Sequence, residues 1–148
     1  LHPYMVEGPF RDFFSCIPPK RALMAESSRF FVDKTRSRKL GLAHLPLTEM
    51  LLFSMHDHGE LTGLKSIVTV VSDAMARIVR QAGWHYQILD SGEASPGETV
   101  HLLDMPISSS NRLRLLESIA RKQPLSSLQT QQWPLSLQLH DVSDNHIA

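Results

Sequence analysis

The sequence contains one cysteine, Cys16, in 148 residues, and it has no net charge, because fifteen Lys and Arg balance fifteen Asp and Glu. A single cysteine excludes an internal disulfide framework and a zinc site made of several cysteines, and it is typical of a reducing, cytoplasmic setting. Proteins dedicated to nucleic acids are usually basic overall, so no nucleic-acid partner is expected.

Long apolar runs and the common nucleotide motifs are absent from the sequence as well. No run approaches the roughly 18 residues that a membrane-spanning helix needs, so no membrane partner is expected. The GxGxxG, P-loop and GxSxG motifs do not occur. The hydrophobic content of 42% is ordinary for a globular protein of single-domain length. We expect one domain over residues 1–148, with a disordered tail at 140–148.

The order of apolar and turn residues predicts alternating strands and helices. The expected strands cover 28–33, 65–72, 84–89 and 97–107, and the expected helices cover 48–61, 74–82 and 109–122. The charged stretch 34–42 is too polar for an interior and is expected to be a solvated loop. This order predicts an α/β fold whose sheet is mixed, at least partly parallel, and flanked by helices.

Capping residues mark the ends of two of these helices. Thr48 is expected to cap the first helix, and Gly63 is expected to end it. Ser72 or Asp73 is expected to cap the second helix, which ends at Gly83.

The stretch ESSRFF places Glu26 and Arg29 directly before two phenylalanines. On a strand, Glu26 shares one face with Ser28 and Phe30, so its carboxylate lies one pleat from an aromatic ring. Partial desolvation raises the pKa of a carboxylate and makes it a usable general base. The alternative is a solvated residue at a strand end that pairs with a nearby cation.

Two hydroxyl side chains, those of Thr69 and Ser72, lie where an apolar strand leads directly into a helix. Junctions of this kind are where α/β proteins bind ligands. The alternative is that Ser72 only caps the helix and that Thr69 is a core residue whose hydroxyl is satisfied within the fold.

Six cations form two groups that flank the expected strands. They are Lys34, Arg36, Arg38, Lys39, Arg77 and Arg80. A basic surface on a neutral protein suits an acidic protein partner through charge complementarity. The alternative is a solvated loop with no partner.

The HDHGE stretch at 56–60 contains three residues of metal-ligand type, His56, His58 and Glu60. Histidines two positions apart on a helix point in different directions. We therefore expect no metal site here.

Taken together, these motifs resemble the acyl-homoserine-lactone synthases, the LuxI-type autoinducer synthases of bacterial quorum sensing. The similar blocks are ESSRFFVDKTRSR, PLTEMLLFSM, IVTVVSDAMARIVRQAGW and a terminal WPL, and the similarity extends from about Pro3 to Leu139. The resemblance implies the fold of the GCN5-related N-acetyltransferases, with a splayed mixed sheet, here without its N-terminal strands.

The resemblance also implies an acyltransferase reaction that uses no cofactor. An acyl group, carried as a thioester on acyl carrier protein, is transferred to the amine of the co-substrate S-adenosylmethionine. The acylated product then forms a lactone and releases methylthioadenosine.

Roles for single residues follow from the same resemblance. Glu26 is similar to the proposed general base of the family, and Arg29 to an arginine that holds the charged network of the site. The residues similar to those lining the reaction chamber and acyl tunnel are Phe10, Phe14, Ser28, Met55, Thr69, Val71, Ser72, Met75 and Met105. A threonine at position 69 accompanies 3-oxoacyl substrates in the family. The six cations correspond to the expected docking surface for acyl carrier protein.

One region of the family pattern is missing from this sequence. Family members have an N-terminal region that binds S-adenosylmethionine, whereas this chain resembles only their C-terminal two-thirds. We therefore expect the fragment alone to be inactive and poorly folded, because strand edges and apolar surface would be exposed. Two alternatives stay open. One is an N-acyltransferase that uses acyl-CoA, which the lack of a glycine-rich pyrophosphate loop disfavours. The other is a non-catalytic remnant that binds acyl chains or carrier protein.

Overall fold

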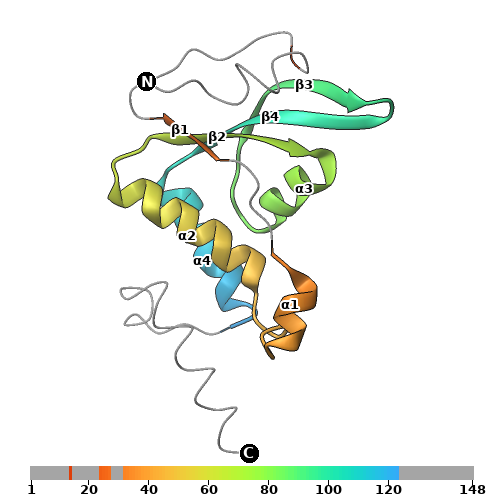
Figure 1. Cartoon of the computed structure of the whole chain (residues 1–148). Coiled ribbons are helices and arrows are strands. Elements are labelled where there is room, and N and C mark those ends of the chain that lie inside the picture. Colours follow the sequence, from red (N-terminus) through yellow and green to blue (C-terminus); the bar gives the residue numbers. More distant parts are fainter. Residues whose placement is uncertain (1–13, 15–23, 28–31, 124–148) are drawn as a thin grey trace, which may run out of the picture.

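The computed structural model describes Phe14, residues 24–27 and residues 32–123. These residues form a four-stranded sheet with helices packed on one face (Figure 1). The strands are β1 (Met24–Ser27), β2 (Ser66–Ser72), β3 (Gln87–Ser95) and β4 (Glu98–Pro106), and the helices are α1 (Lys34–Lys39), α2 (Leu47–Leu61), α3 (Asp73–Gln81) and α4 (Ser109–Ala120). None of these helices has the length and apolar character that crossing a membrane requires.

The sheet has the strand order β1-β2-β4-β3 and is mixed. β1 runs parallel to β2, whereas β4 runs antiparallel to both β2 and β3. β2 is rich in β-branched residues and almost entirely buried, as expected of a central strand that is covered on both faces. The predicted α/β class with a mixed, partly parallel sheet is therefore confirmed.

Successive residues of β2 point to opposite faces of the sheet. Ile67 and Val71 pack with α2, α3 and α4 in a large core cluster that also contains Trp84. Val68 packs on the other side with Phe14. We call these two sides the helix face and the opposite face.

Charged and aromatic side chains join α2 to α4 on the helix face. Nη1 of Arg112 on α4 lies 2.8 Å from Oδ1 of Asp57 and 3.1 Å from Oε2 of Glu60, both on α2. The guanidinium carbon of Arg112 also lies 4.8 Å from the ring centroid of Phe53. One arginine thus contacts the α2 helix at three residues and fixes the two helices side by side (Figure 1).

The connection from α3 to β3 passes close to α4. Gly83 has a φ of +105°, and a Cβ added there would lie 2.8 Å from the backbone of Arg114, so only glycine fits without strain. The next residue, Trp84, is fully buried, and its Nε1–H donates to the carbonyl oxygen of Pro106 at 3.0 Å. This connection therefore ties the end of α3 both to α4 and to the end of β4.

The strand expected over 28–33 and the loop expected over 34–42 were predicted wrongly. The strand is β1 at Met24–Ser27, while Val32 and Asp33 are not in a strand, and 28–31 lie outside the described residues. The side chain of Asp33 accepts a hydrogen bond from the backbone N of Arg36 at 2.9 Å and so begins α1, where a loop was expected.

The third expected strand, over 84–89, begins later in the chain than expected. β3 starts at Gln87 because Trp84 turns into the core and the hydroxyl of Tyr86 donates to the carbonyl of Ala76 at 2.8 Å. β3 then continues into a hairpin with β4 through a turn at Gly97, whose φ is +79°.

The expected helix ends are confirmed at three of four places. Ser72 caps α3 by accepting a hydrogen bond from the backbone N of Met75, and Gly63 and Gly83 follow α2 and α3 with positive φ. Thr48 is not a cap, because Pro46 occupies that position without a side-chain hydrogen bond. The tail expected at 140–148 lies outside the described residues.

Candidate functional site

Glu26 lies on β1, half-buried, and is paired in register with Val68 of β2. Residues paired in this way point to the same side of a sheet, so Glu26 lies on the opposite face with Val68. The following residue, Ser27, is paired with Thr69, whose hydroxyl donates to the carbonyl oxygen of Ser27 at 2.8 Å. Thr69 therefore fastens β2 to β1 directly beside Glu26.

Most of the residues expected to line the acyl tunnel gather on the helix face. They are Met55, Thr69, Val71, Met75 and Met105. Phe14 packs on the opposite face, so the structure places Phe14 and Glu26 across the sheet from this group. Phe10, Ser28 and Arg29 lie outside the described residues.

The contacts of Thr69 and Ser72 agree with the structural alternative, in which Thr69 is a core residue and Ser72 caps a helix. Thr69 is a fully buried core residue whose hydroxyl proton is donated within the fold. Ser72 is exposed at the start of α3, and its oxygen accepts the capping hydrogen bond at 3.2 Å. A hydroxyl has one donor and two acceptor sites, so Ser72 keeps its donor for a ligand while Thr69 keeps only acceptor capacity.

The expected docking cations lie exposed on two helices. Four of them, Lys34, Arg36, Arg38 and Lys39, belong to α1, and Arg77 and Arg80 belong to α3. Arg77 pairs with Asp73, and the guanidinium carbon of Arg80 lies 4.5 Å from the ring centroid of Tyr86. Within the described part of the chain, no carboxylate lies within ion-pair distance of the four α1 cations.

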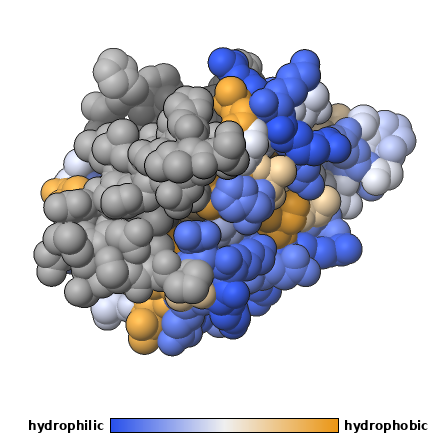
Figure 2. Space-filling model, turned by 90° about the horizontal axis from the view of Figure 1, so that it is seen from below, coloured by the Kyte–Doolittle hydropathy of each residue, from blue (hydrophilic) through white to orange (hydrophobic). Residues whose placement is uncertain are grey.

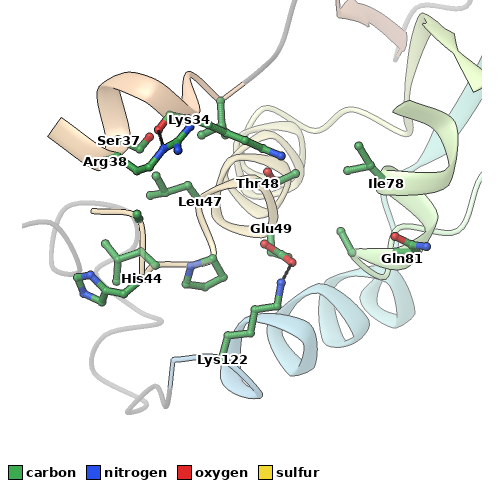
Figure 3. Close-up of a pocket in the computed structure, with 15 residues that line it drawn as sticks. Lys34, Ser37, Arg38, His44, Leu47, Thr48, Glu49, Ile78, Gln81 and Lys122 are labelled. Atoms are coloured by element: carbon green, nitrogen blue, oxygen red, sulfur yellow. Dashed lines mark hydrogen bonds and ion pairs between the residues drawn. The ribbon is translucent and has the colours of Figure 1, made fainter. Parts of the chain in front are cut away.

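A cavity of about 510 Å³ lies between α1, the start of α2, and the ends of α3 and α4 (Figure 3). Its lining includes Lys34 and Arg38 of α1 and Ile78 and Gln81 of α3. α1 and α3, which carry the six cations, thus border one hollow. Of the residues expected to line the acyl tunnel, none that the structure describes is part of this cavity.

A chain of hydrogen bonds that the sequence did not indicate joins the β3–β4 hairpin to α3. Nδ1 of His101 lies 2.7 Å from Oγ of Ser91, and Nε2 of His101 lies 3.1 Å from Oδ1 of Asp73. The hydrogen bond with His101 is the main cause that lowers the pKa of Asp73. These residues come from β3, β4 and α3, so their approach depends on the strand register and not on spacing along the chain.

The HDHGE stretch makes contacts within the fold. His56 is fully buried, its Nε2 accepts the backbone N–H of Ser108 at 3.1 Å, and its ring stands edge-on to Trp84 with centroids 5.2 Å apart. Burial is the main cause that lowers the pKa of His56. The two carboxylates of the stretch bind Arg112, as described above. In the described ranges, no group of three or more His, Cys, Asp or Glu could hold a metal ion.

Comparison with known proteins matches residues 1–115 to the family described as autoinducer synthase. An acyl-homoserine-lactone synthase of Pseudomonas amygdali pv. tabaci is 62% identical over 135 residues, which cover 91% of this chain and 59% of that protein. An acyl-homoserine-lactone synthase of Pectobacterium carotovorum subsp. carotovorum is 33% identical over 134 residues, covering 90% of this chain and 62% of that protein. The chain thus spans about three-fifths of the length of these relatives.

Two solved structures share the fold. The CoA-dependent acyl-homoserine lactone synthase MesI superposes with a TM-score of 0.67 at 21% identity, over 86% of this chain and 60% of that one. TofI, in a ternary complex with an inhibitor and MTA, superposes with a TM-score of 0.60 at 18% identity, over 77% of this chain and 56% of that one. These similarities confirm the expected fold class. Because the family match covers most of the sequence, the chain belongs to the autoinducer synthase family.

Proposed function

We propose that the protein containing this chain is a cytoplasmic acyl-homoserine-lactone synthase. It joins an acyl group to the amine of S-adenosylmethionine, and the product then forms a lactone and releases methylthioadenosine. The family match over residues 1–115 carries this proposal. The presence of MTA in the TofI complex supports the methylthioadenosine step. The proposal concerns the complete protein, and we expect the 148-residue chain alone to make no lactone.

The proposed chemistry begins with proton removal by Glu26. An amino-terminal type of ammonium has a pKa of about 7.7–8, so it must lose a proton before its nitrogen can attack. The Glu26 carboxylate, half-buried on β1, takes this proton. The nitrogen then bonds to the thioester carbonyl carbon, the carbon–sulfur bond breaks, and the thiol leaves with a proton. Arg29, three residues away, holds the charged groups of the site in place.

We place the acyl chain along the tunnel residues of the helix face. Unbranched methionines such as Met55, Met75 and Met105 adapt to a flexible chain. For a 3-oxoacyl group, the hydroxyl of Thr69 would donate to the extra carbonyl. That bond requires the hydroxyl to leave the carbonyl of Ser27, which it contacts at 2.8 Å.

The proposed acyl donor is acyl carrier protein, docked on the exposed cations of α1 and α3. Four cations within one six-residue helix, none of them paired with a carboxylate that the structure describes, favour an acidic partner. Acyl-CoA is the second candidate donor, because the structurally similar MesI is CoA-dependent.

The reaction is tested by expressing the complete protein in a bacterium that makes no lactones. Mass spectrometry of culture extracts should find an acyl-homoserine lactone whose mass gives the chain length and the 3-oxo state. Glu26→Gln should reduce its yield by about 100-fold or more, because general-base catalysis contributes about that much. Glu117→Gln, a change of an exposed carboxylate on α4, is the matched control and should leave the yield unchanged.

Two results would contradict these assignments separately. An unchanged lactone yield in Glu26→Gln would remove Glu26 from the role of base. No lactone from the folded complete protein would overturn the proposed function and favour a non-catalytic remnant that binds acyl chains or carrier protein.

The donor is tested by measuring KM for acyl carrier protein and for acyl-CoA with the same acyl group. Replacing Arg36 and Lys39 by Gln should raise KM for the carrier-bound substrate severalfold, with a smaller effect at high salt, and should leave acyl-CoA kinetics unchanged. Lys65→Gln, an exposed cation outside α1 and α3, is the control. A lower KM for acyl-CoA, unaffected by the α1 changes, would instead identify acyl-CoA as the donor.

A further inference from the structure

Among the described residues, neither Glu26 nor any residue proposed to line the acyl tunnel borders the cavity beside α1, although Lys34 and Arg38 of the proposed docking surface do. The cavity lies at the end of the molecule that carries α1, at the bottom of Figure 1, and its volume is about 510 Å³. Small-molecule pockets in proteins have volumes of roughly 300–1,000 Å³. Seen from below, this end shows apolar surface set among hydrophilic atoms (Figure 2).

One wall of the cavity is apolar. Leu45 and Leu47, at the start of α2, pack against the main core cluster and face the hollow from there. On the α3 side, Ile78 is 40% exposed and contributes apolar surface to the lining. These side chains give the cavity an apolar wall, against which a hydrocarbon chain could pack.

The mouth of the cavity has an excess of positive charge. Lys34 and Arg38 of α1 and Lys122 after α4 are cations, whereas Glu49 is the only carboxylate among the described lining residues. Lys122 already pairs with Glu49, so Lys34 and Arg38 remain uncompensated by any described carboxylate (Figure 3). Nε of Arg38 donates to the backbone carbonyl of Lys34 at 3.3 Å, which holds the Arg38 side chain against α1.

The start of α2 adds to this positive field. The α2 helix has 15 residues, and Pro46 at its N-cap provides no side-chain hydrogen bond. The first turn of a helix carries partial positive charge that favours anions. The apolar wall and the cations define the site, and the helix start, whose first turn also holds Glu49, makes a smaller contribution.

We propose that this cavity binds a single-chain amphiphile with an anionic head group, of the fatty-acid or alkyl-phosphate kind. The head group lies between Lys34 and Arg38, and the hydrocarbon chain lies along Leu47 and Ile78. The inference does not rest on the acyl-transfer chemistry, because among the described residues neither Glu26 nor a proposed tunnel residue lines the cavity, and it shares only Lys34 and Arg38 with the proposed docking surface. A neutral amphiphile would lose the charge pairing and a bare anion would lose the apolar contact, so each should bind more weakly.

Isothermal titration calorimetry of the complete protein tests the proposal with four probes, the amphiphiles being kept below their micellar concentrations. Decanoate and decyl phosphate should bind at a single site, and their relative affinities identify the preferred head group. Octyl glucoside and inorganic phosphate should bind at least about tenfold more weakly, because charged hydrogen bonds and chain burial are each worth about that factor. Equal binding of octyl glucoside or of inorganic phosphate would overturn the proposal.

Matched variants locate the binding. Lys34→Gln with Arg38→Gln, and separately Ile78→Asp, should each weaken decanoate binding about tenfold or more. The controls are Lys65→Gln and Leu113→Asp, an exposed cation and an exposed leucine away from the cavity, which should change nothing. Circular dichroism checks folding, and Ile78→Ala replaces Ile78→Asp if that variant is unfolded. Unchanged affinity in the cavity variants would overturn the site.

A free amphiphile and a membrane lipid share the same head-group chemistry. Co-sedimentation with phosphatidylglycerol vesicles distinguishes them. The proposed cavity takes a single chain, so the protein should remain in the supernatant. Sedimentation that depends on Lys34 and Arg38 would instead assign these cations to a membrane surface and overturn the proposal.

Discussion

Two cationic regions of this molecule use their charge in opposite ways. Between α2 and α4, the side chain of Arg112 is only 26% exposed, bound to Asp57 and Glu60 and stacked on Phe53. The last turn of α1 alone contains three basic residues, and no residue of α1 is buried. In the described part of the chain, no carboxylate pairs with these cations. The first region, Arg112 with Asp57, Glu60 and Phe53, holds α4 against α2, and we call it the joint. The second region, α1, is an exposed charged surface.

The difference shows that a cation takes its role from its surroundings and not from its local sequence. The carboxylates that bind Arg112 lie 55 and 52 residues earlier in the chain. The α1 cations have no such distant partner in the described ranges, so they stay available for an external anion. Changes in the joint should therefore alter global stability, whereas changes in α1 should alter binding.

The largest effect is expected from the core beside the joint. Trp84→Ala should lower the free energy of unfolding by about 3–5 kcal/mol, because it empties a fully buried site and removes the hydrogen bond to Pro106. Urea denaturation measures this. Ile88→Ala, at a side chain that is 46% exposed, should cost under about 0.5 kcal/mol. Similar losses in both variants would mean that Trp84 is not part of a packed core.

Removal of the arginine in the joint should have a smaller effect. Arg112→Ala should cost about 1–3 kcal/mol, because it leaves the largely buried Asp57 carboxylate without its partner. A double-mutant cycle with Asp57→Asn isolates the coupling between the two side chains. Arg36→Ala in α1 is the comparison and should cost less than about 0.5 kcal/mol. Equal costs for Arg112→Ala and Arg36→Ala would erase the distinction between the two regions.

The joint should also respond to pH through His56. Burial holds the pKa of His56 below its usual 6.5, so the folded protein favours the neutral ring. The stability should be complete above pH 6.5 and should decline as the pH falls toward the folded-state pKa, since the unfolded chain binds the proton more readily. His56→Gln should flatten this dependence between pH 7 and 5, whereas His85→Gln, at an exposed position, should not. An unchanged slope in His56→Gln would assign the dependence to another group.

The smallest global effect is expected in α1. Asp33→Ala removes the helix cap but should change the free energy of unfolding by less than about 0.5 kcal/mol, because α1 buries no residue. Hydrogen exchange of the α1 amides should nevertheless become faster, since a cap contributes about 0.5–2 kcal/mol to its own helix. Ser108→Ala, at the cap of the packed helix α4, should lower global stability. A comparable global loss in Asp33→Ala would show that α1 folds with the core.

The elements predicted well from sequence are those determined by nearby residues. α2, α3 and α4 follow from helical periodicity and turn glycines, and β2 follows from its β-branched run. α1 was missed because its cap, Asp33, was assigned to a strand. The start of β3 was misplaced because the burial of Trp84 depends on Pro106, 22 residues away.

The candidate site shows the same limit. Its residue roles came from a resemblance to a family, and the sequence alone left an alternative open for Glu26, for Thr69 and Ser72, and for the cations. The contact of Thr69 with Ser27 spans 42 residues, and that of His101 with Asp73 spans 28. Such contacts depend on strand order and register, which single-sequence patterns do not specify.

The parallel pairing of β1 with β2 has a consequence for how the protein folds. The hairpin of β3 and β4 closes through a turn of a few residues, whereas β1 meets β2 only across the segment that contains α1 and α2. Closing a longer loop costs more chain entropy, and such non-local pairings form slowly. We expect β1 to dock after the hairpin has formed, so Glu26 reaches its final position among the last events of folding.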